Sequence, residues 1–225
     1  MFIEGKELVK KYGKGEATVY ALDHTDFSME KSEIVVILGP SGSGKSTLLN
    51  ILGGLDKATE GSMIVDGKDL EKMSAKELEI YRREKLGFVF QSYNLTPDLT
   101  VRENVEMTAE LVKDPLDVDA LIENLGLTKY EKHFPKELSG GQQQRVAVAR
   151  AIAAQPPIIL ADEPTGNLDS KSTIEIMNIL KDLHESGRTV IIITHDDEIA
   201  NQVDRVVRIM DGKIVSDSVN PSPCY

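Results

Sequence analysis

The sequence predicts an α/β fold with a mainly parallel core sheet, an antiparallel β subdomain and an inserted α-helical subdomain. Short apolar runs rich in Ile and Val are bounded by Gly, Pro or charge, which suits strands buried on both faces. Helical patterns follow or separate these runs, and this alternation implies right-handed crossovers between parallel strands. With 225 residues, 40% of them hydrophobic, the chain can form one α/β domain with an added helical lobe.

Each element is predicted from its own pattern, in chain order. The terminal part contains runs that read as strands joined by turns, at 2–10, 21–29 and 61–65. The buried strands are expected at 34–38, 87–90, 158–161 and 190–194, and the helices between them at 45–52, 145–154 and 170–185. The stretch 93–135 has no convincing strand and reads as helices punctuated by Pro97, Pro115 and Gly126. Near the end, strands at 206–210 and 213–215 flank Asp211-Gly212, a strong hairpin signal.

Charge and cysteine content argue against several classes of function. The net charge of −11 disfavours binding to phosphate backbones and to anionic lipid, so we expect no nucleic-acid partner. The single cysteine, Cys224, allows no intrachain disulfide and fits a reducing compartment. The first residues lack the apolar segment of a signal peptide, and no apolar run approaches the ~18 residues of a membrane span. We therefore expect a cytoplasmic chain without direct membrane insertion.

A glycine-rich loop between the strand at 34–38 and the helix at 45–52 fits the pattern G-x-x-x-x-G-K-[ST]. It consists of Gly39, Pro40, Ser41, Gly42, Ser43, Gly44, Lys45 and Ser46, followed by Thr47. Glycines let successive N–H groups face one anion, and the helix start adds its positive end. Lys45 supplies charge for the β- and γ-phosphates, and the Ser46 hydroxyl is placed for Mg²⁺. The alternative, an ordinary Gly/Ser turn, explains neither the Lys-Ser pair nor the flanking elements, so a P-loop NTPase is predicted.

Two adjacent acids end the apolar run at 158–161. If that strand lies in the parallel sheet, its carboxyl end reaches the crevice of the phosphate loop. Asp162 can then order Mg²⁺, and Glu163, on the other side of the pleat, can act as base toward a water in line with the γ-phosphate. The alternative is a solvated acidic turn, which this segment alone does not exclude.

The run Leu138-Ser139-Gly140-Gly141-Gln142, lying between the phosphate loop and the acidic strand, makes the chain resemble the ATP-binding-cassette (ABC) ATPases over 1–216. Free N–H groups and a hydroxyl at this helix start form a second anion site. The resemblance implies that it meets the γ-phosphate held by a second copy, so that two ATP molecules are sandwiched in an ATP-dependent homodimer. The alternative is a helix cap made of small residues.

Further positions match the family one by one. Tyr12 matches the aromatic residue that stacks on adenine, with a packed strand-end tyrosine as the alternative. Gln91 matches the glutamine that senses Mg²⁺ and the attacking water, and His195 the histidine that contacts the γ-phosphate. The segment 167–169 matches a loop that senses the other site, although Asp169 could equally cap the next helix.

The resemblance also implies domain limits and a branch. It places the core with the antiparallel β subdomain at 1–91 and 156–216, the helical subdomain at 92–155 and a tail at 217–225. Four runs, at 52–56, 86–95, 99–105 and 162–169, look like the MacB/LolD/FtsE-like branch, whose ATPases drive few-helix permeases. The expected function is therefore ATP hydrolysis that drives a MacB/LolD/FtsX-like membrane permease through the helical subdomain, in export, lipoprotein release or mechanotransmission. The chain would lie on the inner face of the membrane; the match thins between 107 and 119, where the permease should bind.

Two other classes compete with this interpretation. A soluble ABC ATPase acting on nucleic acid or ribosomes would normally carry insertions that 225 residues do not accommodate. A nucleoside kinase or GTPase with the same loop would lack the run at 138–142 and, in a GTPase, would show the motif Asn-Lys-x-Asp.

Overall fold

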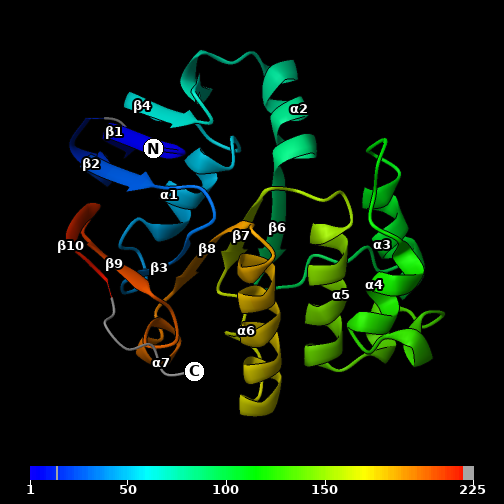
Figure 1. The fold of residues 1–225 in the computed structure, drawn as a ribbon. Helices are drawn as coiled ribbons and strands as arrows, with labels where there is room; N and C mark the ends of the chain where they lie inside the picture. Colours follow the sequence, from blue (N-terminus) through cyan, green and yellow to red (C-terminus); the bar gives the residue numbers. More distant parts are fainter. Residues whose placement is uncertain (14, 220–225) are drawn as a thin grey trace. The chain divides into compact units, whose positions relative to one another are not determined.

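The computed structural model describes residues 1–13 and 15–219, so Cys224 and the end of the expected tail lie outside the described residues. The chain divides into two compact units, one formed by 1–80 with the residues from 189 onward, the other by 81–188. Figure 1 shows the elements of both. The helical subdomain expected at 92–155 falls inside the second unit.

The first unit contains an antiparallel sheet in the order β2-β1-β4-β5. Its strands are β1 (Ile3–Tyr12), β2 (Val19–Met29), β4 (Glu60–Val65) and β5 (Lys68–Asp69). Ile3 pairs with Met29 on one side and with Val65 on the other. Bulges interrupt β1, and Glu7 and His24 have positive φ there. The strands predicted at 2–10, 21–29 and 61–65 are thus present.

The first unit also contains the parallel strands that carry the phosphate loop, in the order β10-β9-β3-β8. These are β3 (Ile34–Leu38), β8 (Thr189–Thr194), β9 (Arg205–Met210) and β10 (Lys213–Val219). Every residue of β3 and β8 is buried, as expected for strands covered on both faces. Asp211 and Gly212 both have positive φ, which is the requirement of the type I′ turn that joins β9 to β10.

The helices of the first unit are short. They are α1 (Lys45–Leu52), α7 (Asp197–Ala200) and the 3₁₀ turns Gly15–Ala17 and Leu70–Lys72. The helix α2 (Ala75–Lys85) leads out of this unit. The sequence analysis did not predict α2, although Ser74 and Glu77 form a capping box, with the Glu77 carboxylate accepting from the Ser74 N–H at 2.8 Å.

The second unit has two parallel strands and four α-helices among the described residues. They are β6 (Leu86–Phe90), β7 (Ile158–Asp162), α3 (Val101–Ala109), α4 (Val118–Asn124), α5 (Gly140–Ile152) and α6 (Ser170–Glu185), with 3₁₀ turns at Thr128–Tyr130 and Pro135–Glu137. Within this unit α3 packs against both α4 and α5 (Figure 1). The helix predicted at 145–154 starts earlier, at Gly140, because Ser139 caps it.

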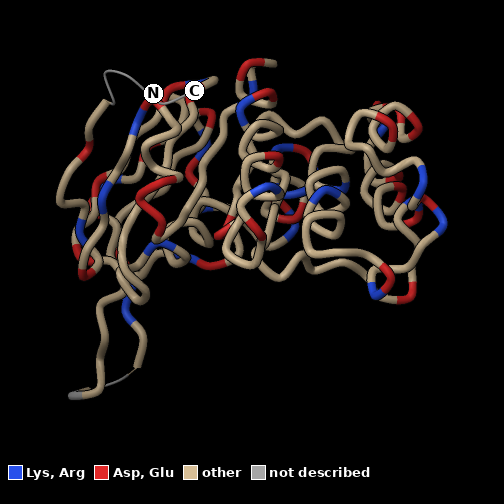
Figure 2. The backbone as a smooth tube through the Cα atoms, turned by 90° about the horizontal axis from the view of Figure 1, so that it is seen from below, with Lys and Arg blue, Asp and Glu red and all other residues tan. Residues whose placement is uncertain are grey.

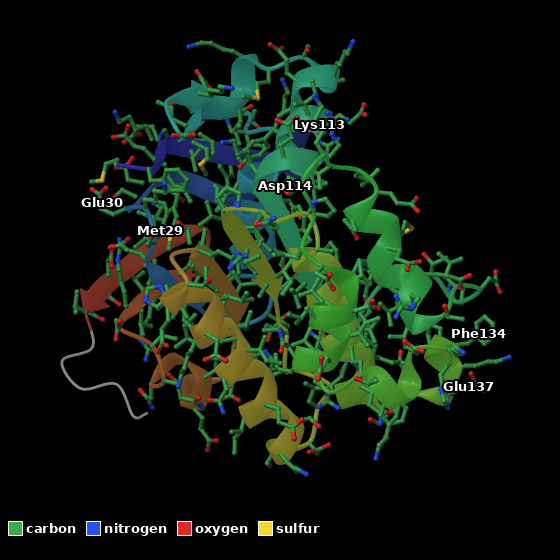
Figure 3. All side chains as sticks on the ribbon, turned by 45° about the vertical axis from the view of Figure 1, so that its right-hand side comes forward. Met29, Glu30, Lys113, Asp114, Phe134 and Glu137 are labelled. Carbon is green, nitrogen blue, oxygen red and sulfur yellow. The ribbon has the colours of Figure 1, made fainter. Side chains whose placement is uncertain are left out.

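Local caps order the irregular segments of the second unit. Phe134 and Glu137, which lie side by side before α5 (Figure 3), form such a cap: the Phe134 N–H donates to the Glu137 carboxylate at 2.7 Å. Acidic and basic residues alternate along the chain in both units (Figure 2). Across residues 1–13 and 15–219, none of the helices has the length and apolar character that crossing a membrane requires.

Candidate functional site

The site residues predicted from the sequence fall into two groups, one in each unit. The phosphate loop, Tyr12 and His195 belong to the first unit, whereas Gln91, Asp162, Glu163 and the run at 138–142 belong to the second. Each group is built by different elements. Among the described residues there is no cluster of three or more His, Cys, Asp or Glu side chains that could hold a metal.

The phosphate loop joins β3 to α1 and depends on two of its glycines. Gly44 is the N-cap of α1 with φ 105°, and a Cβ there would lie 2.3 Å from the Ala21 carbonyl oxygen. A Cβ on Gly39 would lie 2.3 Å from the carbonyl oxygen of Ile209. Only glycine fits both positions. The loop therefore packs closely on β2 and β9 and holds its backbone in a curled conformation.

The start of α1 is arranged to receive an anion. Gly44 offers no side-chain cap, so the first N–H groups of the helix have no side-chain acceptor at the N-cap. Lys45 is only 6% exposed, and its ammonium donates to the carbonyls of Gly39 at 2.7 Å and Pro40 at 2.9 Å. A pocket of about 260 Å³ lies beside it, lined by Ala21, Gly42, Gly44, Lys45, Ser46 and Thr47. Positive charge, the helix N-terminus and a small open volume together fit phosphate groups.

His195 is brought next to this loop by strand pairing. Leu38 at the end of β3 pairs with Thr194 at the end of β8, and the Gly39 N–H donates to the Thr194 carbonyl at 3.3 Å. His195 follows Thr194 directly and is exposed. The strand-end position expected for it is the one it occupies.

Tyr12 ends β1, and its ring is 45% exposed. Its hydroxyl donates to the Asp56 carboxylate at 2.8 Å. Burial, followed by the Asp56 hydrogen bond, raises the pKa of this hydroxyl, whereas a hydrogen bond with the Thr47 side chain lowers it. Sequence reasoning had identified Tyr12 but had missed Asp56, which it used only as part of the run at 52–56.

In the second unit, strand register brings Gln91 and the two acids together. Phe90 of β6 pairs with Asp162 of β7, so Gln91 and Glu163 follow at the same edge. A Cβ on Gly166 would lie 2.7 Å from the Gln91 amide nitrogen, which shows how closely Gln91 packs on the loop after Glu163. The Asn167 amide also donates to the Gln91 carbonyl at 3.2 Å.

Glu163 has a φ of 46°, a left-handed conformation that is uncommon for a residue other than glycine. Backbone strain of this kind costs about 1–3 kcal/mol and clusters at functional positions. The Gly166 N–H donates to the Glu163 carbonyl at 3.1 Å and closes the turn. The turn orients a carboxylate that a regular continuation of β7 would point elsewhere.

The run at 138–142 begins α5, with Ser139 as its N-cap. The Ser139 hydroxyl accepts from the Gln142 N–H at 3.3 Å, and the Gln142 side chain accepts from the Ser139 N–H at 2.8 Å. This capping box is what the alternative interpretation expected, and it leaves a role in anion binding as a prediction. A Cβ on Gly141 would lie 2.4 Å from the Ser172 hydroxyl oxygen, so this glycine allows α5 and α6 to meet closely.

Asp169 caps α6 in the same way. Its carboxylate accepts from the Ser172 N–H at 2.9 Å and from the Ser172 hydroxyl at 3.0 Å. The backbone hydrogen bond, and then the side-chain one, lower the pKa of Asp169. The structure thus shows the capping role that the sequence left open beside the proposed sensing role.

Comparison with known proteins identifies the relatives of the chain. Residues 22–166 match the family model described as ABC transporter. The macrolide export ATP-binding/permease protein MacB of Hyphomonas neptunium is 47% identical over 97% of this chain, but the chain spans only 35% of that relative's length. An uncharacterized ABC transporter ATP-binding protein of Methanocaldococcus jannaschii, MJ1508, is 48% identical over 95% of this chain and 97% of its own length.

The fold has solved counterparts. The dimeric structure of a post-hydrolysis state of the ATP-binding cassette MJ0796, bound to ADP and Pi, superposes with a TM-score of 0.90 at 42% identity. That match covers 98% of this chain and 99% of the other. The predicted fold class and the predicted resemblance to the MacB-type branch are confirmed. The chain belongs to the ABC transporter family, as an ATP-binding cassette of the MacB type.

Proposed function

We propose that this chain binds and hydrolyses Mg-ATP and that two copies close around two ATP molecules to drive a membrane permease. The observation that carries the proposal is the pocket at the start of α1, where Lys45 and uncapped helix N–H groups surround about 260 Å³. The ATP-binding cassette MJ0796, which is similar over nearly its whole length, is a dimer in the structure bound to ADP and Pi.

Each group of residues would perform one part of the reaction. Lys45 and the N–H groups of α1 would hold the β- and γ-phosphates, and Tyr12 would stack on the adenine. The Glu163 carboxylate would take the proton of the attacking water, while Gln91 and His195 would orient that water and the γ-phosphate. Residues 139–142 would donate to the γ-phosphate bound by the other copy.

The oxygen donors proposed for Mg²⁺ suit that ion. Ser46 offers a hydroxyl, Gln91 an amide oxygen and Asp162 a carboxylate, and hard oxygen ligands are those that Mg²⁺ prefers. Bound there, Mg²⁺ would neutralise charge on the β- and γ-phosphate oxygens. The residues present therefore fit the ion.

The test of this function uses two variants. Glu163→Gln keeps the size and polarity of the side chain but removes the base, so ATP binding should persist while phosphate release falls by about 100-fold or more. Size-exclusion chromatography with ATP should then show a dimer. Glu185→Gln, at the exposed end of α6, is the matched control and should behave as the wild type. A Glu163→Gln protein that binds ATP and stays strictly monomeric would contradict the sandwich.

Lys45→Ala separates binding from chemistry. It removes the ammonium that lies against the loop, and titration calorimetry should show ATP affinity reduced by about tenfold or more. An unchanged affinity would contradict the assignment of this pocket to phosphate.

The permease would dock on the helical part of the second unit. A second pocket, of about 610 Å³, is lined by Arg83, Glu84, Glu110, Leu111, Val112 and Lys113. Leu111 is 55% exposed there, and large exposed apolar side chains mark interaction sites. With such a partner the chain would lie at the cytoplasmic face of the membrane. Leu111→Asp should abolish co-purification with a co-expressed permease of the MacB type while ATPase activity of the isolated chain persists; unchanged co-purification would refute this docking surface.

A further inference from the structure

The side chain of Asp56 lies where it controls the orientation of Tyr12. Asp56 follows α1 in the loop that leads to β4, whereas Tyr12 is the last residue of β1. The Tyr12 hydroxyl donates to one oxygen of the Asp56 carboxylate at 2.8 Å. Thr47, which hydrogen-bonds to the same hydroxyl, also lines the phosphate pocket. The ring is therefore held at the margin of that pocket through its hydroxyl.

Asp56 is itself immobilised by three neighbours. Its other carboxylate oxygen accepts from the Lys10 ammonium at 2.5 Å and from the Lys57 N–H at 2.8 Å, and its own N–H donates to the Asn50 carbonyl at 3.2 Å. Desolvation raises the pKa of Asp56, but the hydrogen bonds from Lys10, Tyr12 and Lys57 outweigh it and leave the pKa below its usual value. The carboxylate is thus an ionised acceptor with a fixed direction.

Backbone hydrogen bonds tie the loop of Asp56 to β1. The Thr59 N–H donates to the Val9 carbonyl at 2.7 Å, and the Lys11 N–H donates to the Thr59 hydroxyl at 3.1 Å. Because the donor strand and the acceptor loop are joined on both sides of the contact, the Tyr12–Asp56 bond does not depend on flexible segments.

Lys10 defines one face of the ring. Its ammonium lies over the Tyr12 ring, 5.1 Å from the centroid, and its side chain is only 13% exposed. A cation at this distance is attracted by the π-face and restrains rotation of the ring. The ring still keeps 45% of its surface exposed, which leaves area for a flat ligand.

We infer that Asp56, supported by Lys10, is a positioning residue that holds the Tyr12 ring as a prearranged platform for the base of a nucleoside triphosphate. The inference rests on the proposed function, since it specifies how the site recognises the part of ATP that the phosphate loop does not touch. A ring that is already oriented loses little rotational freedom when the base stacks, so more of the stacking free energy appears as affinity. Stacking reads no hydrogen-bonding edge, so the platform should accept any purine base.

The test compares ATP with inorganic tripolyphosphate, both with Mg²⁺, by titration calorimetry. Tripolyphosphate occupies the phosphate loop but has no base, so it reports on every effect of a mutation except stacking. Asp56→Ala should weaken ATP binding by about 5- to 20-fold and change tripolyphosphate binding by less than about twofold. Glu79→Ala, an exposed acidic residue of α2 in the same unit, is the control and should leave both affinities unchanged.

A second variant keeps the test sharp if Asp56→Ala folds poorly. Tyr12→Phe retains the ring but loses the hydroxyl, so it should reproduce the selective loss of ATP affinity, and the double variant should lose no more than either single one. Equal losses for ATP and tripolyphosphate in Asp56→Ala would overturn the inference, because a general disturbance of the loop affects both ligands. The inference also fails if Tyr12→Ala weakens ATP while Asp56→Ala and Tyr12→Phe do not. A wild-type chain that binds tripolyphosphate as tightly as ATP, yet hydrolyses ATP, would refute the platform and leave the proposed function standing.

Discussion

Replacing Asn104 by Ala should be among the most destabilising single changes in the second unit. Asn104 belongs to α3, is 0% exposed, and serves the loop that leads into that helix. Its amide nitrogen donates to the carbonyls of Thr96 at 3.1 Å, Leu99 at 3.0 Å and Thr100 at 2.9 Å. Its amide oxygen accepts from the Thr96 N–H at 2.8 Å.

The magnitude follows from these contacts. A hydrogen bond contributes about 1 kcal/mol net, and each buried polar group left without a partner costs about 1–3 kcal/mol. Four bonds are lost in Asn104→Ala, and the backbone groups around the site leave some of that cost unrelieved. We therefore expect the free energy of unfolding to fall by about 3 kcal/mol. Asn104→Asp should be no better, because it keeps the acceptor but loses both donated hydrogens and buries a carboxylate.

Urea unfolding followed by circular dichroism measures the loss. The matched control is Asn124→Ala at the exposed end of α4, which should change stability by less than about 0.5 kcal/mol. A loss below about 1 kcal/mol in Asn104→Ala would refute the claim that this amide organises the loop.

Further predictions concern the two helix starts and acid stability. Gly44→Ala should cost about 1–3 kcal/mol and weaken ATP binding, because φ is 105° and the new Cβ would lie 2.3 Å from the Ala21 carbonyl oxygen; wild-type thermal stability would contradict this. Gly141→Ala should cost about 1–3 kcal/mol through its clash with Ser172, and Ser172→Gly should restore part of the loss in the double variant; strictly additive losses would exclude the contact. The folded pKa of Asp169 is lowered, so its stabilising contribution is present above its unfolded pKa of about 4 and is lost as the pH falls through the folded value. The urea midpoint should therefore fall between about pH 5 and pH 3 by less in Asp169→Asn than in the wild type; an identical fall would refute a role for this cap.

Elements with strong local signals were predicted closely from the sequence. The strand Ile34–Leu38 and the helices Lys45–Leu52 and Ser170–Glu185 occur where expected, because apolar runs, glycines and caps act over a few residues. The turn at Asp211-Gly212 follows for the same reason, since both residues accept positive φ. Where local signals conflicted, the prediction was less complete: glycines argued against a helix at 140, although the cap at Ser139 starts one there.

The chemistry of the phosphate loop, the family and the mixed α/β fold were therefore determined by the sequence itself, since each depends on residues that are adjacent or regularly spaced. Tertiary structure alone decided which distant residues meet. The register of β6 and β7 places Gln91 beside the turn of Glu163, and the loop after α1 brings Asp56 to the hydroxyl of Tyr12, 44 positions away in the chain. Such contacts depend on strand register and loop paths, which are settled by packing across the whole unit and leave no periodic mark in the sequence.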